Sequence, residues 1–166
     1  MGDTESRTIL IKGGHIVTEK GVFLEDLLIR GEQIIEIEKW SEYDIDETVD
    51  ATGLLVFPGA VDTHVHLNDV FMNTVSVHDY FTGTLAAAFG GVTSIIDFSN
   101  QRHGDSLVAT ITDKKSEATG KALIDWGVHP VITDPNPETL YEIRKVVEMG
   151  SPTIKCYMTY REEGLL

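Results

Sequence analysis

From Val56 onward, the sequence alternates short apolar runs with amphipathic segments that carry helix start and stop signals. This alternation predicts strands at residues 56–66, 92–98, 122–129 and 153–158, and helices at residues 78–89, 106–119 and 136–150. A strand–helix repeat favours parallel strands joined by right-handed helical crossovers. We therefore predict an α/β fold, either an open doubly wound sheet or the first half of a (β/α)₈ TIM-type barrel.

The N-terminal part has a different pattern, in which short β-rich runs are separated by glycine-containing turns. The runs, which predict hairpins, are residues 8–12, 15–18, 27–29 and 33–37. Residues 40–50 are acidic and predict a connecting loop. Because so few narrow strands are marginal alone, we expect them to be covered by another layer. We thus divide the chain into residues 1–55, a small β-domain segment, and residues 56–166.

Polar side chains that could carry function gather where the predicted strands end. His64, His66, Asn100 and His129 all fall at carboxyl ends, where both candidate architectures place their sites. The sequence lacks a Gly-x-Gly-x-x-Gly fingerprint and a Walker lysine motif. This weakens the nucleotide-binding version of the open sheet.

The segment Asp62-Thr63-His64-Val65-His66 has the spacing of a metal-ligand pair. Side chains on a strand alternate between faces, so the two histidines point the same way. Two imidazoles on one face can share a divalent ion such as Zn²⁺. The alternative is a pair of hydrogen-bonded histidines at a strand end.

Lys155 lies in the middle of the last apolar run. Burial disfavours the charged ammonium and lowers the pKa of a lysine, which leaves a nucleophilic amine that can react with CO₂. The resulting carbamate resembles a carboxylate and can bridge two metal ions. The alternative is a lysine paired with a carboxylate such as Asp62 or Asp97.

Charge and cysteine content exclude several classes of partner. Acidic residues outnumber basic ones 27 to 13, and the formal charge of -14 would repel nucleic acid and anionic membrane surfaces. No apolar run reaches the ~18 residues expected of a transmembrane helix. The single cysteine, Cys156, reads as a small buried residue and agrees with a cytoplasmic location.

Four motifs in order along the chain together resemble the cyclic amidohydrolase superfamily, and within it the dihydropyrimidinase and hydantoinase family. They are Asp50–Gly59, Asp62–His66, Gly83–Phe98 and Ile154–Tyr160. The resemblance implies two divalent ions, usually zinc, at the mouth of a (β/α)₈ barrel. It also implies a small β-sandwich that precedes the barrel and is assembled from both chain ends.

The resemblance also assigns roles to individual residues. His64 and His66 match metal ligands, and Lys155 matches the carbamylated lysine that bridges both ions. Tyr160 matches the tyrosine that orients the substrate and donates to the developing oxyanion. Because strict alternation would put Tyr160 on the face opposite Lys155, the strand must end or bulge before it. Leu67 and Phe71 are expected, with Tyr160, to line the substrate pocket.

The implied reaction is hydrolysis of a dihydropyrimidine or hydantoin ring to an N-carbamoyl amino acid by a metal-bridging hydroxide. The resemblance also implies a cytoplasmic homotetramer with a small-molecule substrate. The alternatives are an allantoinase-like enzyme and a non-catalytic assembly protein on the same scaffold. A whole barrel takes about 250 residues, and family members draw further ligands from later strands, so we expect the sequence to be incomplete.

Overall fold

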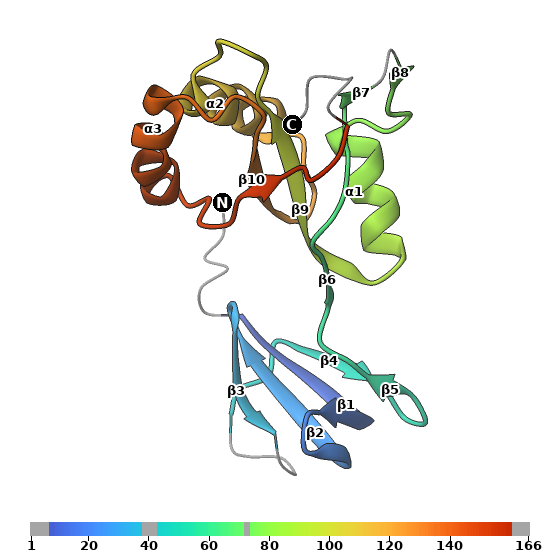
Figure 1. Ribbon diagram of the computed structural model, residues 1–166. Helices are drawn as coiled ribbons and strands as arrows, with labels where there is room; N and C mark the ends of the chain where they lie inside the picture. The colour runs from blue at the N-terminus through green and yellow to red at the C-terminus, as the bar shows by residue number, and fades with distance from the viewer. Residues whose placement is uncertain (1–6, 38–42, 72–73, 161–166) are drawn as a thin grey trace. The chain divides into compact units, whose positions relative to one another are not determined.

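The computed structural model describes residues 7–37, 43–71 and 74–160. The chain divides into two compact units, Met1–Pro58 and Gly59–Leu166 (Figure 1). In the part of the chain that is described, no helix combines the length and the apolar character that crossing a bilayer requires.

The first unit is built on one five-stranded sheet. Its path is β3-β2-β1-β4, with β5 also paired to β1. Neighbours β1, β2 and β3 are antiparallel, whereas β4 and β5 run parallel to β1. The strands are β1 (Thr8–Thr18), β2 (Gly21–Arg30), β3 (Gln33–Ile37), β4 (Glu47–Asp50) and β5 (Leu55–Val56).

Two expectations for this unit are corrected. The runs at residues 8–12 and 15–18 form one strand, β1, with a register shift between Ile11 and Gly14. Gly13 takes a left-handed backbone (φ 71°), and its N–H donates to Asp26 Oδ1 at 2.8 Å. The chain therefore continues through the predicted turn as a bulged strand. The expected loop at residues 40–50 contains strand β4, and residues 40–42 lie outside the described part.

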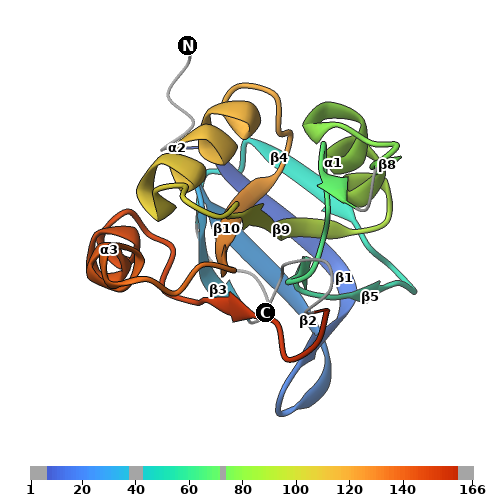
Figure 2. The same ribbon diagram turned by 45° about the horizontal axis from the view of Figure 1, so that its top comes forward.

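The second unit is a curled parallel sheet of four strands in the order β11-β10-β9-β6. Helices α1, α2 and α3 follow one another along its outer face (Figures 1 and 2). A two-stranded antiparallel hairpin, β7-β8, precedes α1. The elements are β6 (Ala60–Asp62), β7 (Val70–Phe71), β8 (Thr74–Val75), α1 (Tyr80–Phe89), β9 (Val92–Asn100), α2 (Leu107–Ala118), β10 (Asp125–Ile132), α3 (Pro137–Glu148) and β11 (Lys155–Cys156).

All three predicted helices form, and each begins at a capping side chain. Asp79 accepts from Thr82 N–H at 2.8 Å, and Ser106 and Asn136 accept in the same way at the starts of α2 and α3. These bonds satisfy backbone donors that the first turn of a helix leaves without partners. The helices pack on the sheet through buried apolar side chains: Leu107, Ile111, Val128, Ile132 and Val146 in one cluster, and Leu67, Tyr80, Ile95 and Ala118 in another.

The predicted first strand, residues 56–66, is wrong in its extent. Val56 pairs with β1 in the first unit, and only Ala60–Asp62 joins the parallel sheet. Pro58 lies between these two pairings and has no N–H for a ladder. A Cβ on Gly59 would lie 2.1 Å from Thr93 Oγ1, so only glycine allows this close approach to β9. The histidines therefore follow the strand instead of belonging to it.

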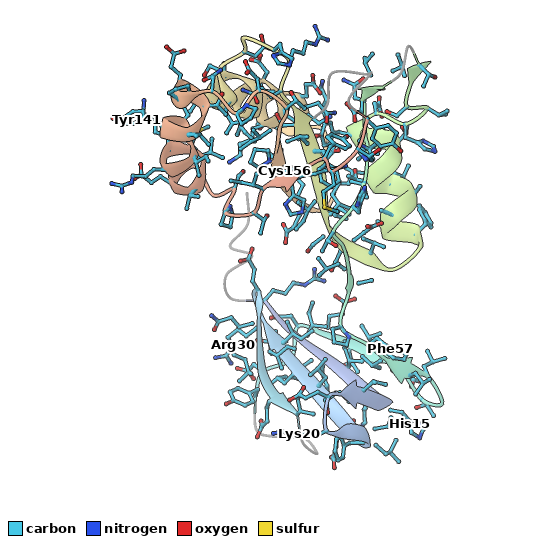
Figure 3. The ribbon with its side chains drawn as sticks, viewed as in Figure 1. His15, Lys20, Arg30, Phe57, Tyr141 and Cys156 are labelled. Atoms are coloured by element: carbon cyan, nitrogen blue, oxygen red, sulfur yellow. The ribbon has the colours of Figure 1, made fainter. Side chains whose placement is uncertain are left out.

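The third strand, β10, continues past Pro130, which was expected to close it. Val131 O accepts from Gln101 N–H on the β9 side, so the nitrogen of Pro130 points the opposite way. Pairing with β11 on that side begins only at Val131, and no ladder bond is lost to the missing N–H. The fourth strand is shorter than predicted, because β11 comprises Lys155–Cys156 alone. Cys156 is exposed and not buried as expected (Figure 3).

Candidate metal centre

The ring of Phe98, on the inner face of β9, is the centre about which the predicted metal residues gather. Its centroid lies 4.6 Å from that of His64, 4.9 Å from that of His66 and 5.3 Å from that of His129. Phe98 itself is only 4% exposed. A buried ring thus supports three imidazoles from two segments of the chain, the loop after β6 and strand β10.

Lys155 completes this group from β11, the strand that pairs with β10. Its Nζ lies 4.1 Å from the Phe98 centroid and 5.0 Å from that of Tyr157, both within cation–π range. Burial lowers the pKa of Lys155, and the attraction of Asp69 opposes this only in part. A larger fraction of the lysine is therefore the neutral amine than at an exposed site.

The two carboxylates considered as partners for Lys155 have other partners. Asp97 lies 3.3 Å from Lys114 Nζ, and Asp62 Oδ1 accepts from the backbone N–H of His64 at 3.0 Å. Within the described residues, no carboxylate lies within ion-pair distance of Lys155. The structure therefore does not support the paired-lysine alternative.

His64 and His66 lie side by side, as the spacing predicted. Their ring centroids are 5.3 Å apart, with the rings inclined by 63°. Burial lowers the pKa of His64, and the nearby Lys155 ammonium adds to this effect. A lowered pKa favours the neutral imidazole, which is the form that binds metal.

A cavity of about 490 Å³ opens beside this group. Its lining residues are His66, Asp69, Thr74, Val75, Ser76, Lys155, Tyr157 and Tyr160. Tyr160 follows the end of β11 by four residues and has a left-handed backbone, φ 68°. The expectation that the strand ends before Tyr160 is confirmed, and this turn brings Tyr160 to the same cavity as Lys155.

Of the other two expected pocket residues, only Leu67 has a described side chain. Leu67 is 9% exposed and packs in the core with Tyr80 and Ile95, so its side chain does not line the cavity. The sequence interpretation was wrong because the side chain turns into the core directly after His66. Phe71 lies on β7, but its side chain is outside the described part of the structure.

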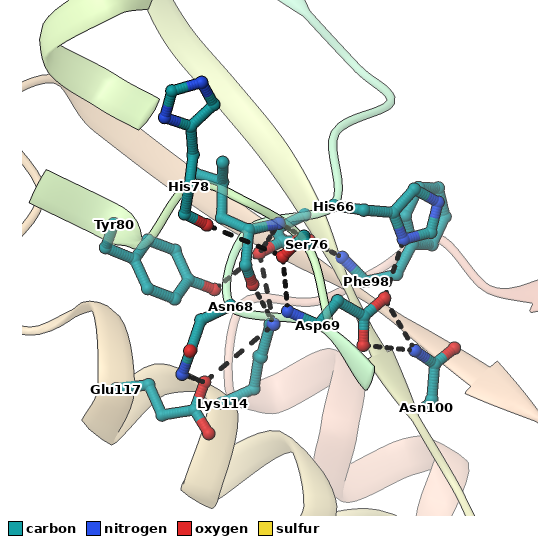
Figure 4. Close-up of polar contacts among 12 residues, drawn as sticks. His66, Asn68, Asp69, Ser76, His78, Tyr80, Phe98, Asn100, Lys114 and Glu117 are labelled. Atoms are coloured by element: carbon teal, nitrogen blue, oxygen red, sulfur yellow. Dashed lines mark hydrogen bonds and ion pairs between the residues drawn. The ribbon is translucent and has the colours of Figure 1, made fainter. Parts of the chain in front are cut away.

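A buried polar network on the outer face of β9 holds the backbone next to His66 (Figure 4). Asp97 accepts from the Tyr80 hydroxyl at 2.7 Å and from Leu67 N–H. Lys114 Nζ donates to the carbonyl of Leu67 at 2.7 Å. Both backbone polar groups of Leu67 are thus tied to buried side chains, which fixes the segment that carries the histidines.

The donor set in this part of the chain would gain oxygen ligands for a metal ion if Lys155 were carbamylated. Among the described residues, no group of three His, Cys, Asp or Glu side chains is placed to hold a metal ion. Two imidazoles and a lysine amine come together instead. A carbamate on that amine would supply the oxygen ligands that the imidazoles lack, so the residues fit a metal centre of the carbamate type.

Comparison with known proteins shows which proteins the chain is similar to. No protein-family model matches the chain. The chain is 42% identical over 156 residues to the D-hydantoinase of Geobacillus stearothermophilus, an alignment that covers 93% of this chain and 33% of the relative. It is 37% identical over 160 residues to dihydropyrimidinase 1 of Caenorhabditis elegans, covering 93% and 33% respectively.

Solved structures agree. A D-hydantoinase crystal structure matches with a TM-score of 0.88 at 40% identity, covering 93% of this chain and 34% of that one. The dihydropyrimidinase of Brevibacillus agri matches with a TM-score of 0.89 at 39% identity, covering 93% and 34%. The chain is homologous to the N-terminal third of the D-hydantoinases and dihydropyrimidinases. It spans about a third of the length of the curated relatives that it matches.

Sequence reasoning missed Phe98, and it assigned no individual role to Asp69 or Tyr157, although both lie in the ranges 67–72 and 156–160 that it expected to form the pocket walls. Phe98 read as one more apolar strand residue, and only alternation with Asp97 signals that it faces inward. Asp69 accepts from His66 Nδ1 at 2.8 Å, and its position three residues after the histidine was the available signal. Tyr157 lies two residues after Lys155, the spacing that shares a strand face.

Proposed function

We propose that the protein hydrolyses a cyclic amide, either a dihydropyrimidine or a hydantoin ring, to an N-carbamoyl amino acid. Water adds its oxygen to the ring carbonyl carbon, the ring C–N bond breaks, and the departing nitrogen takes up a proton. The observation that carries this proposal is the meeting of His64, His66 and Lys155 around Phe98 beside the cavity that also contains Tyr160. The names of the homologues support the choice of substrate class.

In this proposal His64 and His66 hold one of two divalent ions, with zinc as the expected metal. Lys155 would add through its neutral amine to CO₂, with one N–H proton released to water, and the resulting carbamate would supply oxygen ligands for both ions. The pKa of Lys155, lowered by burial, supports this step because only the neutral amine is a nucleophile. When bound, the metal lowers the pKa of water to about 7 and polarises the substrate carbonyl.

Tyr160 donates its hydroxyl proton in a hydrogen bond to the oxyanion that develops on the substrate carbonyl. It contacts Tyr157 edge-to-face, with 5.9 Å between the ring centroids. The two rings form an aromatic wall beside Lys155, suited to the flat face of a small ring. We assign Phe71 to the same pocket on the sequence argument alone.

The proposal extends to the finer features of fold and assembly. The curled sheet and outer helices correspond to the first half of a (β/α)₈ barrel, and the N-terminal sheet to one layer of a β-sandwich. We propose a cytoplasmic homotetramer, as the family resemblance implies. Neither an allantoinase nor a non-catalytic scaffold is favoured, because the relatives reported above are hydantoinases and dihydropyrimidinases, and His64, His66 and Lys155 are all kept.

The test is to purify the protein, measure its metal content, and assay dihydrouracil and hydantoin opening before and after chelation. We expect zinc to co-purify, chelation to abolish turnover, and added zinc to restore it. His64→Ala should lose both metal and turnover, whereas His15→Ala, an exposed histidine of the first unit, should lose neither. Turnover that survives complete metal removal would contradict the proposal.

A further inference from the structure

Asp69 makes a contact that none of the roles assigned above explains. It lies in the segment between β6 and β7, three residues after His66. Its Oδ2 is 2.8 Å from His66 Nδ1 (Figure 4). The Asp69 side chain is 11% exposed, although it borders the cavity. The Asp69 carboxylate is thus held against Nδ1 of His66, a residue that binds metal in the proposed function.

The Asp69 carboxylate is itself fixed from two directions. Asn100, at the end of β9, donates through Nδ2 to both carboxylate oxygens at 2.9 and 3.0 Å. The backbone N–H of Asp69 donates to Ser76 Oγ at 2.8 Å, and Ser76 N–H donates back to Asp69 O at 2.8 Å. Asp69 is therefore anchored both to the sheet and to the segment after β8, which leaves it little freedom to rotate away from His66.

We propose that Asp69 is a positioning residue for His66. A neutral His66 that donates its Nδ1–H to Asp69 carries the lone pair on Nε2, and the ring is held in one orientation. The inference rests on the proposed function, because Nε2 is the nitrogen that His66 would offer to the metal.

The hydrogen-bond pattern favours this role over that of a direct metal ligand. Asp69 Oδ2 is already shared between His66 and Asn100, and Oδ1 accepts from Asn100. Direct coordination would require the carboxylate to give up these donors. Asn100 supports this role of Asp69, because its amide holds the carboxylate in line with His66.

The first readout is the tautomer of His66 in the metal-free protein labelled with [¹⁵N]histidine, where nitrogen NMR distinguishes Nδ1–H from Nε2–H. We expect Nδ1–H in the wild type and a shift toward Nε2–H in Asp69→Leu, which removes the acceptor at similar size. Asp105→Asn changes an exposed carboxylate elsewhere and should leave the tautomer unchanged. An unchanged tautomer in Asp69→Leu overturns the proposal.

The second readout is zinc affinity, measured by competition with a chromophoric chelator. Loss of a partner that orients a ligating histidine typically costs about 10–100-fold in affinity. We expect this loss in Asp69→Leu and a smaller loss in Asn100→Ala, which keeps Asp69 but frees it. A lower number of bound ions at saturating zinc would mean that Asp69 is itself a ligand, and would also overturn the proposal.

These readouts separate the inference from the proposed function. If the wild type binds zinc and hydrolyses no cyclic amide, the proposed function fails while the tautomer and affinity results still decide the role of Asp69. If Asp69→Leu does not fold, Asn100→Ala carries the same test. A wild-type tautomer and zinc affinity in a folded Asn100→Ala would then overturn the proposal.

Discussion

Two lysines lie on opposite faces of β9, and they differ in whether a carboxylate pairs with them. On the outer face, Lys114 is buried, lies 3.3 Å from Asp97 and donates to the carbonyl of Leu67. On the inner face, Lys155 rests on the Phe98 ring, and no carboxylate of the described residues is within ion-pair distance. A lysine paired with a buried carboxylate is costly to remove, because its partner is left buried and charged, whereas one that is partly desolvated without such a partner is available for chemistry.

The same contrast explains why β9 contributes both to the buried polar network and to the candidate metal centre. Alternation sends Asp97 outward to Tyr80 and Lys114, and sends Phe98 inward to the histidines. The outer network then holds Leu67, the residue next to His66, by both its N–H and its C=O. The hydrogen bonds on the outer face thus fix the backbone of Leu67, and with it the adjacent His66 on the inner face.

The largest effect is expected at Lys155. Lys155→Ala should reduce turnover to background and lower zinc content, because the variant cannot form a carbamate. Short carboxylic acids should restore part of both by occupying the vacated space. Lys121→Ala removes an exposed lysine and should behave as the wild type. Full activity in Lys155→Ala would mean that Lys155 has no chemical role, and would contradict the contrast with Lys114.

Lys114→Ala should act on stability first. Removing one partner of a buried ion pair typically costs about 3–5 kcal/mol, because the other charge is left buried without compensation. Asp97 is fully buried and would lose this cation. Urea denaturation should show the loss in the free energy of unfolding. A change below about 1 kcal/mol, the range of exposed pairs, would contradict a structural role for Lys114.

Tyr160→Phe should reduce kcat while leaving the fold intact. Loss of one oxyanion donor typically costs about 10²–10³ in kcat. The phenyl ring keeps the contact with Tyr157, so the unfolding midpoint should not move. Steady-state kinetics on dihydrouracil, with Tyr141→Phe as an exposed control, measure the effect. An unchanged kcat would exclude Tyr160 from oxyanion stabilisation.

The smallest effect is a pH dependence on the outer face. Burial, reinforced by the Asp97 carboxylate, raises the pKa of Tyr80 far above its usual value. The folded state keeps this proton when the unfolded state loses it, so the free energy of unfolding should fall as pH rises above about 10. The slope is at most about 1.4 kcal/mol per pH unit.

Tyr80→Phe removes the group responsible for this slope, and Tyr141→Phe, an exposed tyrosine, should retain it. Urea denaturation of the wild type and both variants between about pH 8 and 11 provides the measurement, because Tyr80 titrates in the unfolded state near pH 10. Equal slopes in the wild type and Tyr80→Phe would mean that Tyr80 ionises as readily in the folded protein as in the unfolded chain.

The sequence predicted the strand–helix order well, because caps such as Asn136 and turn glycines are local signals. It failed where pairing with another strand decides which sheet a segment joins and where a strand ends. Val56 looks like the start of a barrel strand, yet it pairs with β1, and Pro130 is tolerated in β10 because pairing on its nitrogen side begins one residue later. The residue propensities within a segment predict neither the pairing of Val56 nor the continuation of β10 past Pro130.

For the candidate site, spacing predicted that His64 and His66 lie together, although the chain leaves the sheet at Asp62. The position of Lys155 beside them depends on the order of the strands, which the family motifs supplied. The contact between Asp69 and His66 depends on how the loop is anchored by Asn100, 31 residues later in the chain. Long-range contacts of this kind have no signature in a single sequence.

The central claim is that Lys155, and not the paired Lys114, carries a carbamate. Carbon NMR of the zinc-loaded protein equilibrated with ¹³C-bicarbonate tests it most directly. The account predicts one protein-bound carbamate resonance that is present in the wild type and in Lys121→Ala, and absent in Lys155→Ala. A wild-type spectrum without this resonance, or a resonance that persists in Lys155→Ala, would contradict the account.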